Sequence, residues 1–171
     1  MDSKKAMITA LSTALLSSLV LGSMAASASV TTGDRQALVD AKEYLNTGAF
    51  SLAGLIGQVQ FDGFTKAEAT YGETNSGANW NNEAVADAKD YLNTGAFSFS
   101  GMVKQLNFDK FTPAQATYGA THCGANWNAE AVKDAKQYLS IQSFSLSGLI
   151  GQLEFDGFSA SQATYGAHKA Y

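Results

Sequence analysis

The chain has 171 residues, of which 46% are hydrophobic and 15% are charged, a composition typical of a globular protein. Its formal net charge is −4. That sign argues against nucleic acid and anionic membrane surfaces as partners, because both favour clustered lysine and arginine.

The first 28 residues differ in kind from the rest and are predicted to form a signal peptide. Lys4 and Lys5 give a short basic start, an apolar run covers residues 6–21, and Ala26-Ser27-Ala28 has the small-x-small pattern of a cleavage site. We expect cleavage after Ala28 and an exported protein, extracellular or associated with the cell surface or wall. The alternative is an uncleaved segment that holds the chain at the membrane, since the run is nearly long enough to span one.

A repeat of 47 residues organises the remainder of the chain. Segment 79–119 aligns with 126–166 at 25 identical positions, and a third copy precedes them. Repetition at one fixed spacing defines the structural unit. We therefore predict a signal peptide (1–28) and three units, at 29–72, 73–119 and 120–171. Each unit is near the lower size limit for a core of its own, so we expect neighbours to share apolar surface.

Each unit opens with a predicted amphipathic helix. In segment 84–92, apolar residues recur at i, i+1, i+4, i+7 and i+8, the period of a helix with one buried face. Asn-Thr-Gly (46–48 and 93–95) is predicted to end this helix through a glycine in the left-handed conformation. The third unit has Ser-Ile-Gln there, so its first helix is expected to run slightly longer.

A second helix is predicted after a Phe-Ser pair, with the serine as N-cap and the phenylalanine packed back on the fourth helical residue. In the first unit its apolar stripe is Leu52, Leu55, Ile56 and Val59. A glycine interrupts the stripe in every unit, at positions 54, 101 and 148, although a helical glycine costs about 1 kcal/mol relative to alanine. We expect either a second helix passing close by or a helix that begins near this glycine.

A tight turn and a short third helix complete the unit. The turn reads Phe-Asp-Gly-Phe (61–64 and 155–158) or Phe-Asp-Lys-Phe (108–111), and both rings are expected to point inward. A capping box then starts the third helix, and the only proline of the chain falls on its first helical position in one unit. This helix is predicted to end at Tyr-Gly (71–72, 118–119 and 165–166).

Linkers of seven residues, 73–79 and 120–126, lead to Trp80 and Trp127. The first unit has Gly33 at the same position, which suits a tryptophan that packs between consecutive units, because the first has no unit before it. The sequence thus predicts an all-α tandem array of three small, three-helix, helix-turn-helix-like repeats.

The sequence shows no motif for catalysis, cofactor binding or metal binding. The predicted third helices carry one basic residue, Lys66, too few for a DNA reader. His122 and His168 lie 46 residues apart without ligand spacing. The aspartates of the turns, at positions 62, 109 and 156, are attributed to local hydrogen bonding. We therefore predict a protein that is not an enzyme and that binds neither a cofactor nor a metal ion.

Cys123 is the only cysteine of the chain, so a disulfide within it is excluded. A lone thiol in an exported protein indicates either intermolecular pairing or a tolerated residue. The preceding unit has Ser76 at the same position, so nothing in the repeat requires sulfur, and we favour the second interpretation.

Acidic residues gather on one flank of the first helices and form the candidate partner-binding strip. The common interpretation is a solvated face, and the sharper one is a docking strip for a basic segment of a phage or envelope protein, where charge would speed association and set specificity. Loss of the signal peptide moves the net charge to −5, which favours a basic partner. The residues are Asp40, Glu43, Glu83, Asp87, Asp90, Glu130 and Asp134.

The repeat resembles that of host cell surface-exposed lipoproteins, the Ltp-like family, over residues 37–166. The resemblance rests on Ala41, Tyr44, Leu45, Phe50-Ser51, Gly54-Leu55-Ile56, Gln58, Phe61, Gly63-Phe64, Ala69 and Tyr71. It implies small helix-turn-helix-like modules of exported proteins in Gram-positive bacteria and their phages. Phage-encoded members block entry of DNA from a second phage, which is superinfection exclusion. The chain departs from the family pattern in two respects. Val20-Leu21-Gly22 precedes Ser23 instead of the lipid-bearing cysteine, and the chain carries three units, a number that does not identify a target.

These observations lead to a non-catalytic, exported binding protein at the bacterial surface, for which the resemblance implies interference with phage DNA entry through protein contacts. The alternative is a secreted structural or adhesive module of the wall or surface with no role in phage infection.

Overall fold

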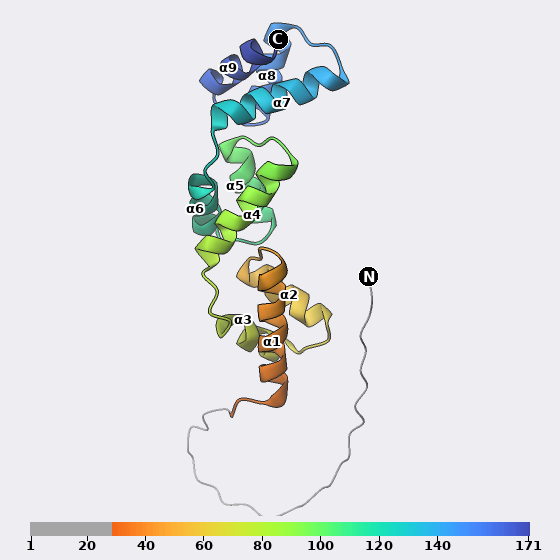
Figure 1. Ribbon diagram of the computed structural model, residues 1–171, viewed down its shortest axis with the longest axis vertical. Coiled ribbons are helices and arrows are strands. Elements are labelled where there is room, and N and C mark those ends of the chain that lie inside the picture. The colour runs from red at the N-terminus through yellow and green to blue at the C-terminus, as the bar shows by residue number, and fades with distance from the viewer. Residues whose placement is uncertain (1–28) are drawn as a thin grey trace, which may run out of the picture.

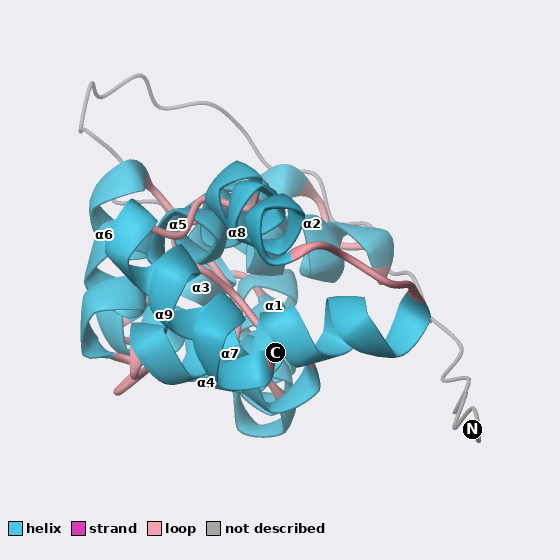
Figure 2. Ribbon diagram, turned by 90° about the horizontal axis from the view of Figure 1, so that it is seen from above, coloured by secondary structure: helices cyan, strands magenta, loops and turns pink. Residues whose placement is uncertain are grey.

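The computed structural model describes residues 29–171, so the predicted signal peptide, its cleavage site and Ser23 lie outside the described residues. All regular structure in this range is α-helical, as predicted (Figure 2). The helices are α1 (Thr32–Thr47), α2 (Leu52–Phe61), α3 (Lys66–Thr74), α4 (Trp80–Thr94), α5 (Phe99–Phe108), α6 (Pro113–His122), α7 (Trp127–Ile141), α8 (Leu146–Phe155) and α9 (Ala160–Ala170). They form three successive clusters, α1–α3, α4–α6 and α7–α9, and Figure 1 shows these clusters stacked along one axis into a rod. We call α1–α3 unit one, α4–α6 unit two and α7–α9 unit three.

Each unit is held together where its first helix crosses its third. The crossing places a glycine of the third helix against the backbone of an alanine in the first. A Cβ atom added to Gly119 would lie 2.5 Å from the carbonyl oxygen of Ala84, and one added to Gly72 would lie 2.7 Å from that of Ala37. Gly166 meets Ala131 in the same way. Only glycine fits so close an approach, because any side chain would force the helices apart.

The prediction that the third helix ends at Tyr-Gly is therefore wrong. The glycine lies inside the helix, and α3, α6 and α9 continue to Thr74, His122 and Ala170. The helix continues because close packing at the crossing outweighs the low helix propensity of one glycine. The linkers are correspondingly shorter than expected. Lys169 also falls within α9, so the third helices contain a second lysine besides Lys66.

The glycine of the second helix has a different role from the one first expected. No neighbouring helix passes Gly54, whose amide instead donates a hydrogen bond of 3.0 Å to the Oγ of Ser51, the N-cap. An added Cβ at this position would lie 2.9 Å from that oxygen. Helix α2 begins two residues before this glycine, which agrees with the second expectation, a helix start nearby.

The predicted caps are present. Serines 51, 98 and 145 cap α2, α5 and α8, and capping boxes start α3, α6 and α9 with Pro113 at the first position of α6. The end of the first helix differs from the prediction, because Gly48 (φ −172°) and Gly95 (φ −152°) are extended rather than left-handed. Gln142 adopts the same conformation (φ −154°), so α7 is no longer than α4.

Only one of the two phenylalanines in each turn points inward. Phe111 and Phe158 are buried, with exposed fractions of 3% and 4%. The first ring of each turn, at Phe61, Phe108 and Phe155, is 86%, 82% and 84% exposed, so the prediction for these three is wrong. Successive helical residues are rotated by about 100°, so Phe61, two positions after buried Val59, falls on the opposite side of α2.

Neighbouring units meet through the serine that caps the second helix. The Oγ of Ser51 donates a hydrogen bond of 2.5 Å to the backbone carbonyl of Asp109, in the turn of the next unit. Ser98 makes the same bond, 2.7 Å long, to Asp156. Both serines are 2% exposed, whereas Ser145 in unit three, which makes no such bond in the described residues, is exposed. One hydroxyl therefore caps a helix and joins two units.

The second joint carries three hydrogen bonds that the first lacks. Ser100 donates to the carbonyl of Gly157 at 2.9 Å, and Lys133 Nζ donates to the carbonyls of Leu92 (2.6 Å) and Gly95 (2.7 Å) at the end of α4. In the repeat before, alanines 53 and 86 occupy the positions of Ser100 and Lys133. The joint between units two and three is thus the more firmly bonded.

The difference between Ser100 and Ala53 explains why one turn position holds glycine at the second joint and lysine at the first. Gly157 has a φ of +92°, and Lys110 adopts a similar left-handed conformation with a φ of 71°. A Cβ on Gly157 would lie 2.1 Å from the Oγ of Ser100, so a side chain there would force Ser100 to move. Lys110 is accommodated at the first joint because Ala53 has no hydroxyl to occupy that space.

Unit one contains a buried acid where the other units have alanine. Glu73 is 1% exposed, and neither of its carboxylate oxygens has a hydrogen-bond partner in the described part of the chain. Burial raises the pKa of Glu73 to about 7. Ala120 and Ala167 stand at the equivalent positions and are buried in the cores of units two and three.

Replacement of Gly119 by alanine tests the helix crossing. The added methyl group would overlap the Ala84 carbonyl, so we expect a loss of about 1–3 kcal/mol in the free energy of unfolding. Thermal and urea unfolding followed by circular dichroism measure it. The control is Gly151→Ala in α8, where nothing lies within 4 Å of the added Cβ. That variant should be neutral or gain up to about 1 kcal/mol, and equal effects of both changes would contradict the role of the crossing.

Glu73→Ala should stabilise the protein, because it removes a buried carboxyl group without partners, which costs about 1–3 kcal/mol. The pKa of Glu73 is higher in the folded chain than its ordinary value of 4.5, so its stabilising protonated form is lost as the pH rises through about 7. The gain in melting temperature should therefore be larger at pH 8 than at pH 4. A gain independent of pH, or a loss, would refute this account.

Candidate functional site

The acidic flank of the rod is built from a cluster that recurs in every unit. The cluster consists of a tyrosine from the first helix, a glutamine from the second and the aspartate of the turn. The tyrosine and the aspartate are 18 residues apart in the sequence. In unit two, Tyr91 Oη donates to Asp109 at 2.9 Å, and Gln105 Nε2 donates to Tyr91 Oη at 3.0 Å. Tyr44 donates to Asp62 in the same way at 2.8 Å.

Sequence analysis missed the role of these tyrosines and glutamines and assigned the turn aspartates to local hydrogen bonds only. The structure instead ties each aspartate back to the first helix of its own unit, and in unit three Gln152 donates both to Tyr138 and to Asp156. The one available signal was that all three residue types recur at fixed spacing in all three copies. That signal does not show which of them touch.

A second aspartate, from the predicted strip, lies beside each cluster. Asp87 in α4 is half-buried, and its pKa is raised to about 7 by burial first and then by the charges of Asp109, Asp90 and Glu83. Asp134 follows the same pattern, with a pKa raised to about 6 by burial, Asp156 and Glu130. In both units the neighbouring carboxyl groups thus lie close enough to oppose the ionisation of this aspartate.

Unit one repeats the arrangement in a more open form. Burial, followed by the charges of Asp62 and Glu43, raises the pKa of Asp40. The pKa of Tyr44 is raised, and its hydrogen bond to Asp62 is the largest cause. In unit two burial comes first, and with Asp109 it raises the pKa of Tyr91 to about 12.

Two members of the predicted strip face the joints. Burial raises the pKa of Glu83, and the backbone amide of Phe50 in the preceding unit acts in the opposite sense. Glu130 lies 3.8 Å from Lys133, the lysine that donates to the end of α4. The remaining members divide into half-buried Asp40, Asp87 and Asp134 and exposed Glu43 and Asp90.

The two predicted packing residues lie at the starts of α4 and α7. Trp80 packs against the core of unit one and Trp127 against that of unit two. The Trp127 ring stands edge-on to Phe99 of unit two, with 5.6 Å between the ring centroids. Each tryptophan is the first helical residue of one unit, yet it covers the core of the unit before it.

A groove opens on this flank at the joint of units one and two. Its volume is about 520 Å³, and both units contribute to its walls. It combines aromatic rings with the paired carboxyl groups of unit two, and Lys110 also lines it. The lining residues are Ala49, Phe50, Ser51, Gly54, Asp87, Tyr91, Phe108, Asp109 and Lys110.

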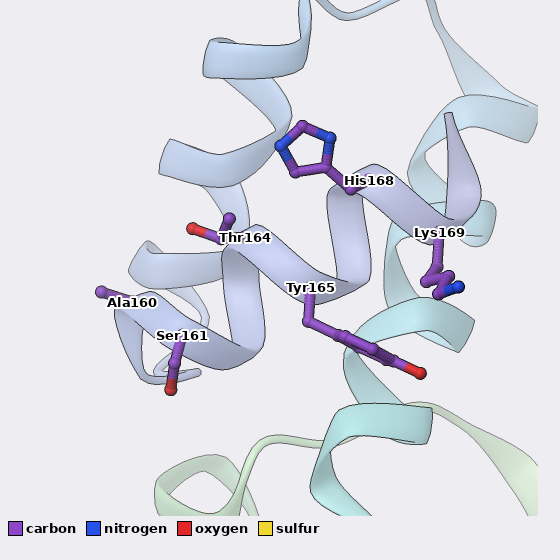
Figure 3. Close-up of a pocket in the computed structure, with 6 residues that line it drawn as sticks. All are labelled: Ala160, Ser161, Thr164, Tyr165, His168 and Lys169. Atoms are coloured by element: carbon purple, nitrogen blue, oxygen red, sulfur yellow. The ribbon is translucent and has the colours of Figure 1, made fainter.

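A second hollow, drawn in Figure 3, lies on the outer side of α9. Tyr165, His168 and Lys169 are among its six lining residues, all of which come from this one helix. It is an open helix face without a facing wall, so it does not bring groups together for chemistry. Within residues 29–171, no three histidine, cysteine, aspartate or glutamate side chains gather as a metal-binding group.

Cys123 belongs to the core of unit two. Its side chain is buried, and Sγ donates to the carbonyl of Ala120 at 3.3 Å. Ser76 makes the equivalent bond in unit one, to the carbonyl of Glu73 at 2.7 Å. The thiol and the hydroxyl thus donate the same hydrogen bond at the end of the third helix. This agrees with the interpretation of Cys123 as a tolerated residue.

Comparison with family models finds three consecutive matches to the model of host cell surface-exposed lipoproteins, at residues 33–75, 79–123 and 126–168. The chain belongs to this family. Each match to the host cell surface-exposed lipoprotein family covers one unit of the rod, from its first helix through its third. Comparisons with curated proteins and with solved structures gave no match.

The name of the family describes proteins displayed at the surface of the host cell, which agrees with the predicted surface location. Among the helices of residues 29–171, none has the length and hydropathy needed to cross a membrane. Ser23, at the position of the expected lipid-bearing cysteine, lies outside the described residues.

Replacement of Asp109 by asparagine should lower the pKa of Asp87, because it removes the strongest charge that opposes ionisation there. The pKa should stay above the ordinary value of 3.8, since burial is the larger cause. NMR titration of the carboxyl carbons measures the change. Asp62→Asn in unit one is the control and should leave Asp87 unaffected. An unchanged pKa in Asp109→Asn would show that the two groups do not interact.

Proposed function

We propose that this member of the host cell surface-exposed lipoprotein family is a non-catalytic binding protein. In this proposal it docks a basic segment of a phage or envelope protein on the acidic flank of the rod and thereby blocks entry of phage DNA. The observation that carries the proposal is the groove at the first joint, where Asp87 and Asp109 lie together and open to solvent.

The electrostatics of the groove suit a cationic group. The charge of Asp109 opposes the ionisation of Asp87, and a lysine or arginine between the two carboxyl groups would offset that effect and favour the charged form of Asp87. Glu83 and Asp90 extend the same field along α4. Such a field speeds association and discriminates against acidic partners more than it adds affinity.

The arrangement of these acids supports docking more than reaction chemistry. The hydroxyl of Tyr91 and the amide of Gln105 hold Asp109 in place. The cluster recurs in each unit, as expected for a repeated contact along an extended partner.

Neutralisation of the strip tests the proposal. The variant Asp87→Asn, Asp90→Asn, Asp134→Asn should fold at least as well as the wild type. Burial disfavours the charged forms of Asp87 and Asp134, and a neutral asparagine does not carry that cost. It should lose binding to a basic peptide by about tenfold or more, as expected when close charge pairs are removed. Isothermal titration calorimetry with an arginine–serine peptide measures this loss.

Binding to the wild type should also tighten from pH 6 to pH 8, because Asp87 becomes ionised over that range. The neutralised variant should show no such pH dependence. The control Asp34→Asn removes the acid of the first capping box, at the outer end of unit one, and should bind as the wild type does.

An infection assay separates the phage function from a wall-associated structural role. Cells that produce the wild-type protein should adsorb phage normally and fail to take up its DNA, whereas the neutralised variant should restore uptake. Normal DNA entry in cells with the wild-type protein would favour the structural or adhesive alternative.

A further inference from the structure

Three phenylalanine rings project from the rod at equivalent positions, one from each unit. Phe61, Phe108 and Phe155 end α2, α5 and α8 and are 86%, 82% and 84% exposed. A single exposed apolar side chain needs no explanation. An exposed ring at the same place in three of three repeats is a regular feature of the surface.

The fold does not use these rings. Phe108 and Phe155 belong to turns that contact a preceding unit, whereas Phe61 belongs to the first unit and has no such neighbour. All three are nevertheless exposed to the same extent, so the joints do not cover them. The inward packing of each turn comes from the second phenylalanine, as in buried Phe111.

The residues around the rings have diverged between the copies, while the rings have not. The position before the ring holds Gln60, Asn107 or Glu154, and the position two after it holds glycine or lysine. Exposed sites that serve only solubility are free to vary in this way. The unchanged ring therefore indicates a contact outside the rod.

The charges beside the rings define the chemistry of that contact. An aspartate follows each ring directly, and at the first joint Phe108, Asp87 and Asp109 line one groove. A ring next to a carboxylate suits an arginine or lysine, whose apolar stem packs on the ring while its charged end meets the acid. Flanking apolar residues of the partner would cover the rest of the ring.

We propose that Phe61, Phe108 and Phe155 form a docking row for a polypeptide segment in which arginine or lysine alternates with apolar residues, with one contact in each unit. This inference rests on the proposed binding function and names the aromatic anchors that would act beside the acidic strip. Three weak contacts on one rod raise the overall affinity, because the second and third form at high effective concentration.

The test compares the wild type with the triple variant Phe61→Ser, Phe108→Ser, Phe155→Ser. The matched control is Ile141→Ser at the end of α7, an apolar side chain that is 80% exposed and does not belong to the helices that carry the rings. The rings contribute little to the core, so circular dichroism and the melting temperature should match the wild type. The probes are two synthetic peptides, one of alternating arginine and leucine and one of alternating arginine and serine.

The row predicts that the triple variant binds the arginine–leucine peptide about tenfold or more weakly than the wild type. The same variant should lose less affinity for the arginine–serine peptide, which keeps the contact of the arginine stem but has no apolar residue to cover the rest of the ring. Ile141→Ser should bind both peptides as the wild type does. Single substitutions should each lose part of the affinity, since the contacts act together.

Unchanged binding of the arginine–leucine peptide by the triple variant would overturn the row. The proposed function would then stand if the variant with neutralised aspartates still lost binding, and it would fail if that variant also bound normally. Two further results would overturn the row in favour of other occupants. One is binding of phosphatidylcholine vesicles that depends on the rings, and the other is self-association in sedimentation equilibrium that the triple variant abolishes.

Discussion

The contact on which each unit depends is the crossing of its first and third helices at an alanine and a glycine. Ala84 and Gly119 bring two backbones so close that no side chain fits between them. A unit of this size has few large residues to bury, and the buried core of unit two combines four alanines with Met102, Leu106, Phe111 and Cys123. Close backbone packing supplies the dispersion contacts that a larger core would draw from bulky side chains.

The units are joined differently, through hydrogen bonds and one tryptophan rather than through a continuous apolar layer. Ser51 and Ser98 each cap a helix and also donate to the next turn, so formation of the helix prepares the joint. The acceptors are the backbone carbonyls of Asp109 and Asp156. The carboxylate of Asp109 therefore remains available for its hydrogen bonds with Tyr91 and Gln105. The acidic clusters and the exposed rings therefore sit on the outside of the joints without weakening them.

Local signals predicted most of the fold. Capping boxes, N-cap serines and apolar stripes depend on residues three or four apart, and the repeat itself fixed the number of units. The errors concern packing between segments distant in sequence. The sequence alone did not show that Gly119, rather than Gly101, lies at a helix crossing, because both are glycines within apolar helices. The bond from Tyr91 to Asp109 spans 18 residues and depends on the angle between α4 and α5. The outward turn of Phe108 follows from where α5 ends.

The two joints have the same plan and unequal strength. The second holds four side-chain hydrogen bonds to backbone carbonyls, through Ser98, Ser100 and Lys133, whereas the first holds one, from Ser51. Bending of the rod will therefore concentrate between units one and two, as at a hinge. The groove with Asp87 lies at that same place and takes its walls from both units, so bending there would change the distance between its walls. Tension along the rod would thus act first on the width of this groove.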